Sequence, residues 1–240
     1  IIASYTAAKV SGTYVGGLVG WNHGTVTHCS SDGEVNSVEW CAGGLVGSHS
    51  GNIIAGCSSS AVSGERQVGG LVGQNDGGSI AMSYSTGPVR GNSSVGGLVG
   101  SGYDDAVSTG FWETETSGQA TSDGGEGKTT AEMQDMATFL SAGWDLVGEA
   151  SNGTCDHWDI SPGDYPLLRH LGGNRPSMPE GLGTIEQPYL IRDAEDLGAV
   201  WFEPLAHYRL ACSLDLSGIT WSAAVIPWFG GTFDGDSHVI

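Results

Sequence analysis

The side chains that could perform acid–base chemistry are few and scattered along this sequence. The densest acidic group is Asp234 and Asp236 beside His238, in the stretch FDGDSH. Enzymes that cleave polysaccharides need clustered carboxylates, or carboxylates with Arg or Lys, on one exposed face. FDGDSH has the composition of a structural turn, and no G-x-S-x-G nucleophile motif occurs. We therefore predict no catalytic residue and no enzyme activity.

Metal-binding patterns are equally weak. The five cysteines form no C-x-x-C pair, and His23, His28 and His49 have no paired spacing. The sequence predicts no metal site, no cofactor-binding residue and no cofactor. Weak Ca²⁺ binding by aspartates in turns stays open, with Asp104, Asp105 and Asp215 as the candidates.

The composition narrows the classes of partner. The chain has 240 residues, of which 27 are Asp or Glu and 8 are Lys or Arg, for a net charge of −19. A surface this acidic has no electrostatic footprint for nucleic acid and is repelled by anionic lipid. No apolar run approaches the roughly 18 residues of a membrane span. We expect neither nucleic acid nor a membrane span in this segment.

A glycine-rich phrase organises the first half of the chain. VGGLVGWN, AGGLVGSH, VGGLVGQN and VGGLVGSG begin at Val15, Ala42, Val68 and Val95, in steps of 27, 26 and 27 residues. A repeat period between about 20 and 50 residues is typical of solenoids, propellers and arrays. The residues that we expect to be structural in each phrase are Gly16, Gly17, Leu18 and Gly20; Gly43, Gly44, Leu45 and Gly47; Gly69, Gly70, Leu71 and Gly73; and Gly96, Gly97, Leu98 and Gly100.

The length of the repeat selects among these architectures. A propeller blade needs about 40 residues or more, whereas a unit of about 26 fits one coil of short strands and tight corners. The predicted fold is all-β, a parallel β-helix or β-solenoid of about 26-residue coils with a short helix-containing insertion. Glycine is expected at sharp turns, at positive φ, and where a side chain would collide with the next coil. The four leucines are expected to form an internal apolar ladder.

Two cysteines raise the question of a disulfide between coils. Val10, Val35 and Val89 each follow Ser4, Cys29 and Ser83 by six residues, whereas Val62 follows Cys57 by five. This alignment places Cys29 and Cys57 at one position of neighbouring coils, with a one-residue deletion at a corner. Two alternatives stay open: a disulfide, or two buried thiols, since free cysteine behaves as a small hydrophobe and a bond between adjacent parallel strands is often strained.

The sequence resembles the GLUG-motif family, which is named for the Gly-Leu-x-Gly phrase and found in large bacterial surface and adhesin-like proteins. FWETETSGQATSDGGEGKTTAEMQ from Phe111, AGWDLVGE from Ala142 and YPLLRHL from Tyr165 are similar to the segment that closes such an array. GLGTIEQPYLIRDAEDLGAV from Gly181 and GTFDGDSHVI from Gly231 are similar to the segment that opens the next one. The resemblance implies an extracellular or cell-surface protein and carries over no catalytic motif.

These patterns divide the chain into four expected parts. Residues 1–110 are coils, 111–172 a closing segment, 173–181 a linker, and 182–240 the opening segment of a following module. Within them, the capping box Thr129-x-x-Glu132 predicts a short helix that ends by Gly143, and Asp193 is expected to cap a second helix.

The function that we expect is structural: a spacer, fibre or adhesive surface, built by end-to-end self-association or by continuation in a longer chain. A carbohydrate-binding adhesin module is the alternative, with Trp21, Trp40 and Tyr103 as the ligand surface, since exposed aromatic rings stack on sugars or proteins. A polysaccharide-active β-helix enzyme is a third.

Overall fold

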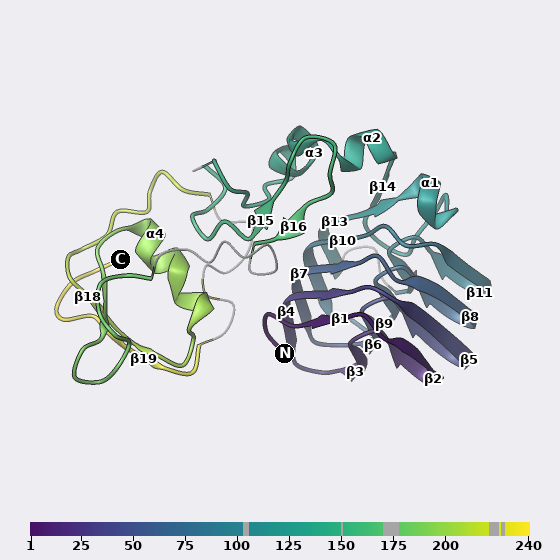
Figure 1. The fold of residues 1–240 in the computed structure, drawn as a ribbon, viewed down its shortest axis with the longest axis horizontal. Helices are drawn as coiled ribbons and strands as arrows, with labels where there is room; N and C mark the ends of the chain where they lie inside the picture. Colours follow the sequence, from purple (N-terminus) through teal and green to yellow (C-terminus); the bar gives the residue numbers. More distant parts are fainter. Residues whose placement is uncertain (103–105, 150, 170–177, 221–225, 227–228) are drawn as a thin grey trace. The chain divides into compact units, whose positions relative to one another are not determined.

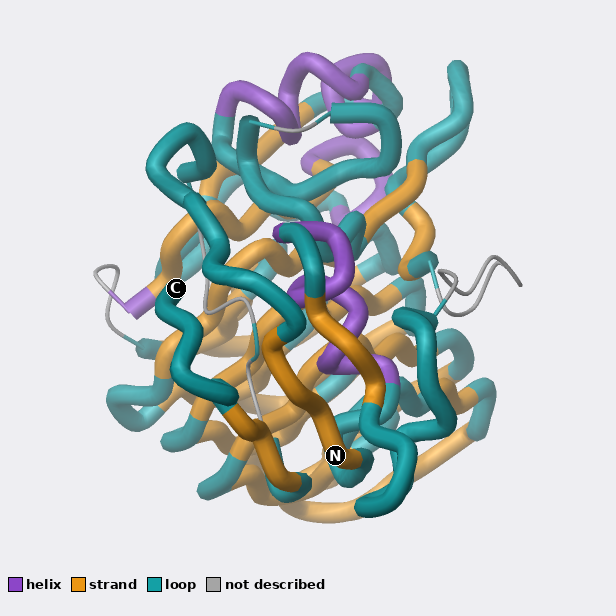
Figure 2. Tube along the Cα trace, turned by 90° about the vertical axis from the view of Figure 1, so that its left-hand side faces the viewer, coloured by secondary structure: helices purple, strands orange, loops and turns teal. Residues whose placement is uncertain are grey.

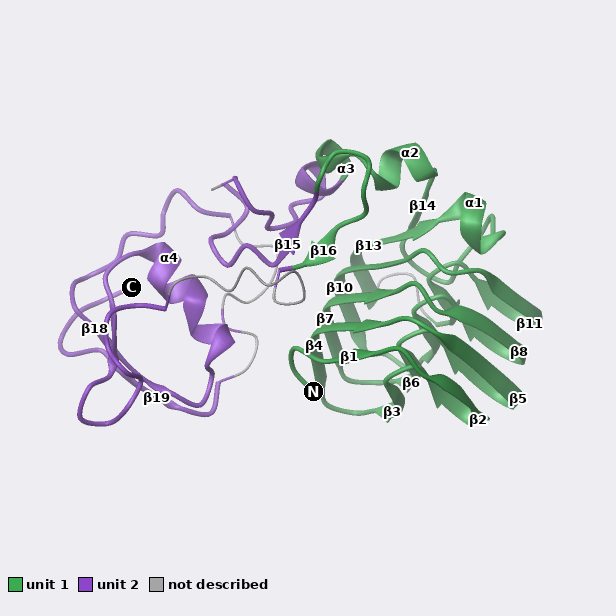
Figure 3. Ribbon diagram, viewed as in Figure 1, with its two compact units in different colours: residues 1–138, 161–168 green, residues 139–160, 169–240 purple. Residues whose placement is uncertain are grey.

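The Gly-Gly-Leu repeats fold into coils that stack on one another in a computed structural model of the chain (Figure 1). The structure describes residues 1–102, 106–149, 151–169, 178–220, 226 and 229–240. They form two compact units, residues 1–138 with 161–168 and residues 139–160 with 169–240 (Figure 3). The expected linker at 173–181 lies largely outside the described residues, and the expected domain boundaries stay a prediction.

Each coil contributes one strand to each of three parallel sheets. Figure 2 colours the strands orange and the helices purple. The first sheet contains β1 (Tyr5–Thr6), β4 (Thr25–Ser31), β7 (Asn52–Ser58), β10 (Ser79–Ser85), β13 (Val107–Glu113) and β14 (Glu126–Lys128). The second contains β2 (Lys9–Gly16), β5 (Glu34–Gly43), β8 (Ala61–Gly69) and β11 (Val89–Gly96). The third contains β3 (Val19–Asn22), β6 (Val46–His49), β9 (Val72–Asn75) and β12 (Val99–Ser101). The predicted parallel β-solenoid is therefore confirmed.

The interior of the solenoid is built from columns of equivalent apolar residues. Leu45, Leu71 and Leu98 are fully buried, and Leu18 packs against the same core cluster. The backbone pairs along this column too: the amide of Leu18 donates to the carbonyl of Leu45 at 3.0 Å, and Leu45 to Leu71 at 2.9 Å. Burying each leucine removes most of its side chain from water, which stabilises the stack by about 1.5–3 kcal/mol per residue. The leucine ladder predicted from the phrase is present.

The repeated glycines are required by close approach between backbones. A Cβ added at Gly43 would lie 1.8 Å from the carbonyl oxygen of Val46, and one at Gly44 would lie 2.0 Å from that of Gly70. The φ angles of the phrase glycines are not in the left-handed region. Of the three roles expected for glycine, positive φ does not apply to the phrase, whereas the sharp turn between two strands and the collision with neighbouring chain both do.

Left-handed backbone occurs instead at non-glycine residues inside the first sheet. His28, Ala55, Met82 and Thr109 occupy one column of neighbouring coils and have φ of 54°, 51°, 46° and 53°. Such a conformation costs a non-glycine residue of order 1 kcal/mol or more, so the surrounding pairing must enforce it. Each of these strands therefore changes direction at the same residue of every coil.

A segment after the last coil covers the end of the stack. Trp112 of β13 takes the position that Ser31, Ser58 and Ser85 hold in earlier coils, and its indole Nε1 donates to the carbonyl of Gln119 at 3.1 Å. The segment includes α1 (Thr114–Ser117), and α2 (Thr130–Met133) follows it. The predicted capping box is present, because the Thr129 side chain and the Glu132 backbone and carboxylate bond reciprocally.

The second unit has its own small core. It contains β15 (Trp158–Asp159), β17 (Tyr189–Ile191), α4 (Ala194–Gly198), the 3₁₀ helix η2 (Ala199–Phe202), β18 (His207–Leu210) and β19 (Thr232–Asp234). In the first unit lies β16 (Leu167–Leu168), and α3 (Met136–Ser141) spans the boundary between the units. Strands β17, β18 and β19 pair in parallel, and Asp193 caps α4 as expected. None of the described helices has the length and apolarity to cross a membrane.

Candidate ligand surface on the solenoid

The end of β2 and the strand β3 present an exposed aromatic cluster in the first coil. The Tyr14 and Trp21 rings meet edge to face with centroids 5.1 Å apart, and the His23 ring lies 5.7 Å from Trp21. The exposed fractions of Tyr14 and Trp21 are 40% and 54%. His23 is held from the next coil by Ser50, whose hydroxyl lies 2.7 Å from its Nδ1. Edge-to-face packing fixes the rings while leaving surface free to stack on a ligand.

A second exposed tryptophan stands on an irregular strand. The register between β2 and β5 shifts after Gly12, and β5 has ten residues where β2 has eight. The extra residues form a bulge that leaves Trp40 41% exposed. The guanidinium of Arg66 from the next coil lies 5.4 Å from the Trp40 ring centroid. A bulge changes the direction in which side chains point. The Arg66 cation orients the Trp40 ring but covers part of the ring surface that could stack on a ligand. The contact of Arg66 with Trp40 was not predicted, because the two residues are 26 positions apart and meet only through the stacking of coils.

A groove of mixed character crosses the coils where the second sheet begins, and Val35, Ala61, Val62 and Pro88 form much of its wall. It has a volume of about 480 Å³, and its polar lining residues are Lys9, Glu34, Asn36, Ser63 and Arg90. Lys9 and Glu34 form an ion pair, and the Ser63 hydroxyl donates to the Asn36 side-chain oxygen at 3.2 Å. This volume lies within the range of small-ligand sites. The groove offers both signs of charge and hydrogen-bonding groups from four successive coils.

The structure describes only two of the three residues that we proposed as a ligand surface. Trp21 and Trp40 are exposed, as a ligand surface requires, whereas Tyr103 lies outside the described residues, as do Asp104 and Asp105 of the expected Ca²⁺ candidates. The Asp215 side chain accepts the amide of Ser217 at 2.9 Å, which accounts for its place in a turn.

The expected equivalence of Cys29 and Cys57 is wrong by one residue. Cys29 pairs with Gly56, and Cys57 pairs with Ser30. Neighbouring residues of a strand face opposite sides of the sheet, so the two thiols do not share a column and form no disulfide. Burial raises the pKa of both thiols, to about 12 for Cys57. They are buried thiols, the second of the two alternatives.

The end of the third sheet contains a buried column of polar residues that we did not predict from the sequence. Asn22, His49 and Asn75 occupy successive coils, and the Asn22 amide nitrogen lies 3.1 Å from His49 Nδ1. His49 Nε2 lies 3.2 Å from the carbonyl oxygen of Ser79. Burial lowers the pKa of His49, so the imidazole is neutral at pH 7. The signal was available, because Asn22 and Asn75 end the phrases GLVGWN and GLVGQN.

Comparison with known proteins supports the reading of the repeats. Residues 11–36 and 64–89 match the model of the GLUG motif. Each match runs from the second sheet through the Gly-Gly-Leu corner, the third sheet and the first sheet, which is one turn of the solenoid. The resemblance to the GLUG family is thus confirmed over these two repeats. No curated protein and no solved structure matches the chain.

Proposed function

We propose that the chain is a non-enzymatic structural module of an extracellular repeat protein, which serves as a fibre, spacer or adhesive surface. The observation that carries the proposal is the register of the coils. Val10, Val35, Val62 and Val89 form one column, and the residues on either side pair in the same order in each coil. In such a stack each coil contacts its neighbours alone, so length scales with the number of repeats.

One further property supports a location outside the cell, because the GLUG repeats resemble those of bacterial surface and adhesin-like proteins. The net charge of −19 favours solubility.

The first coil supports growth by addition of a further coil of the same kind. Among the described residues, β2 and β3 each pair with one neighbour and end their sheets. Val10, Leu18 and Val19 are partly exposed, whereas their counterparts in the second coil are buried. A parallel edge strand with an apolar inner face is a template for pairing. We take the occupant to be another GLUG-type coil, supplied by a second copy or by a longer chain.

Electron microscopy of the chain, together with light scattering across concentration, tests end-to-end growth. We expect filaments or concentration-dependent oligomers, abolished by Val10→Lys on the inner row of β2 and kept by Ser11→Lys on its exposed face. A wild-type chain that stays monomeric at high concentration refutes self-association. The spacer role then depends on coils of a longer chain, and force spectroscopy of the solenoid addresses it separately.

Carbohydrate binding is the second candidate, favoured by the exposed rings of Trp21 and Trp40. On a glycan array we expect Trp21→Ala and Trp40→Ala to lose binding. Tyr5→Ala is the matched control, since Tyr5 is 55% exposed in the first coil but lies on the first sheet. An array on which the wild-type chain binds no glycan, or on which all three variants bind alike, removes this candidate.

A further inference from the structure

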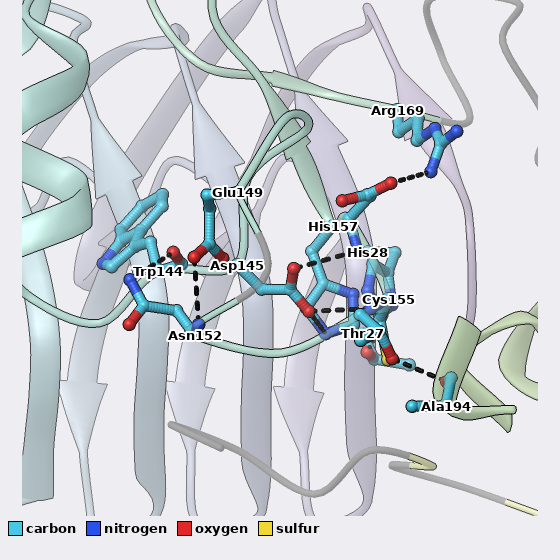
Figure 4. A network of polar contacts seen from close by, with 12 residues as sticks. Thr27, His28, Trp144, Asp145, Glu149, Asn152, Cys155, His157, Arg169 and Ala194 are labelled. Carbon is cyan, nitrogen blue, oxygen red and sulfur yellow. Dashed lines mark hydrogen bonds and ion pairs between the residues drawn. The ribbon is translucent and has the colours of Figure 1, made fainter. Parts of the chain in front are cut away.

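Three metal-ligating side chains of different chemistry converge in the second unit. The carboxylate of Asp145, the thiol of Cys155 and the imidazole of His157 have ligand atoms that all lie within 4.8 Å of one another (Figure 4). Their exposed fractions are 2%, 2% and 3%. All three belong to residues 139–160, outside the solenoid.

Local packing holds the two contributing segments together. The amide of Trp158 donates to the carbonyl of Asp145 at 3.2 Å, and the amide of Val147 donates back to the carbonyl of Trp158 at 2.9 Å. The rings of Trp144 and Trp158 pack with centroids 5.0 Å apart. Asp145 and His157 therefore lie next to a fixed tryptophan pair, on backbone with little freedom to separate.

The loop from Gly153 to Asp156 wraps around the Asp145 carboxylate. The amides of Cys155 and Asp156 donate to its two oxygens at 2.9 and 3.0 Å. Gly153 has a φ of 136°, and a Cβ there would lie 2.3 Å from Asp145 Oδ2. The Thr154 hydroxyl anchors the same loop to α4 by donating to the carbonyl of Ala194 at 2.6 Å. The carboxylate is thus oriented before any ligand arrives.

The distance between the His157 and Asp145 side chains is too long for a hydrogen bond and somewhat longer than a shared ion requires. His157 Nε2 lies 4.0 Å from Asp145 Oδ2, beyond hydrogen-bonding range. Zinc bonds to nitrogen and oxygen are each about 2.0–2.2 Å, and to thiolate sulfur about 2.3 Å, so a shared ion needs a side-chain shift of roughly an ångström. A catalytic triad would instead place its three groups in a hydrogen-bonded line, with the nucleophile accessible.

None of the three side chains is a permanent cation, and the Arg169 guanidinium pairs with Asp156 of the same loop at 2.6 Å. Burial raises the pKa of Asp145 to about 7, and the charges of Asp156 and Glu149 add to the rise. Burial, Asp145 and Asp156 raise the pKa of the Cys155 thiol. Burial lowers the pKa of His157 to about 3. A bound divalent cation would compensate the carboxylate and favour the thiolate.

We propose that Asp145, Cys155 and His157 bind a zinc ion, with water as the fourth ligand. Thiolate with imidazole and carboxylate is a borderline-soft set that suits zinc and not Ca²⁺ or Mg²⁺. Cys155 lines a cavity of about 130 Å³ with Thr154 and Arg169, which has room for the water. The ion joins the Asp145 turn to the 153–157 loop and stabilises the second unit, independently of what the solenoid does.

The test uses the full chain, purified under reducing conditions, with zinc as the probe. We expect one bound zinc per chain by elemental analysis and chelator competition. Cys155→Ser and His157→Gln are expected to weaken zinc binding by well over tenfold, since outer-shell substitutions alone cost about 10–100-fold. Cys212→Ser is the matched control, because Cys212 lies in the same unit with its thiol donating to the carbonyl of Arg192. Unchanged binding in Cys155→Ser overturns the site, as does a wild-type chain that binds no zinc.

X-ray absorption at the zinc edge makes the test independent of whether the variants fold. We expect one sulfur at about 2.3 Å and lighter ligands at about 2.0–2.2 Å. A shell of oxygen alone, or of several sulfurs, overturns the assignment in the wild-type protein itself.

Discussion

Replacing Gly43 by alanine tests the claim that close approach of backbones selects the repeated glycines. The added Cβ would lie 1.8 Å from the carbonyl oxygen of Val46 and 2.6 Å from the amide nitrogen of Gly73. An ordinary contact is about 3.4 Å or more, so relief requires backbone to move by over about 1 Å in strands that pair on both sides. No rotamer change can supply that movement, because the obstructing atoms are main chain.

We expect Gly43→Ala to lower the free energy of unfolding by about 3 kcal/mol or more, the upper end of what overpacking costs. The measurement is the urea midpoint, followed by far-ultraviolet circular dichroism. Gly12→Ala is the matched control: it lies on a strand of the same sheet, where a Cβ would meet nothing closer than the Val15 Cβ at 3.9 Å.

The control should be neutral or stabilising by up to about 1 kcal/mol, because alanine restricts the unfolded chain. Equal midpoints for Gly43→Ala and Gly12→Ala would refute the reasoning and leave the glycines without a steric explanation.

Three further predictions concern buried groups of the first unit. Because burial lowers the pKa of His49, its contribution to stability is complete above about pH 6.5 and is lost as the pH falls below that value. We expect His49→Asn, which places at this position the residue type of its column neighbour Asn22, to flatten the pH dependence of the urea midpoint between pH 7 and 5. An unchanged slope contradicts this expectation. Trp112→Ala should cost about 3–5 kcal/mol by thermal or urea unfolding, since it empties the end of the core, and a loss below about 1 kcal/mol would show that the covering segment does not depend on it. Burial, the hydrogen bond that the Tyr165 hydroxyl donates to Glu113 at 2.8 Å, and the charges of Glu113 and Glu115 raise the pKa of Tyr165 to about 12. In Glu113→Gln a spectrophotometric titration should show that pKa falling, and no change would leave burial and Glu115 as the causes.

The sequence was sufficient to predict the solenoid because its periodicity is a packing requirement. Leucine and valine recur where a side chain enters the core, and glycine recurs where backbone carbonyls approach, so the spacing directly indicates coils. The local helix signals succeeded for a similar reason: the Thr129 and Asp193 caps act through neighbouring amides, without long-range contacts.

The prediction that Cys29 and Cys57 occupy equivalent positions was wrong because the repeats were aligned on the two cysteines themselves. In the structure the alignment of the first sheet is set by the interior column Val26, Ile53 and Ile80, which are 27 residues apart. No deletion occurs between Gly56 and Val62; the irregularity lies in β5, where the bulge absorbs it. The extra residues of the bulge, 38–40, are exposed to solvent and leave the core pattern unchanged, so periodicity alone does not locate it.

The cluster of Asp145, Cys155 and His157 was not predicted because tertiary packing creates it. The Cys-x-His spacing is visible at residues 155–157, but Asp145 is ten residues earlier in the sequence. It becomes a neighbour through the pairing at Trp158 and the glycine loop. Such a spacing lies outside the C-x-x-C patterns by which cysteine sites are recognised.

The covering segment closes one end of the coil stack to further pairing. At the last coil, the Ser122 hydroxyl accepts the amide of Val99 at 2.8 Å, and the amide of Gly97 donates to the carbonyl of Thr121 at 3.0 Å. The covering segment thus uses the backbone groups that another coil would need. A solenoid end that is covered by polar structure resists pairing, so the end-to-end association proposed above has to use the other face of the stack, where the described strands β2 and β3 each pair on one side. Charge placed on the inner row of β2 should therefore abolish that association, whereas charge placed on the covering segment should leave it unchanged.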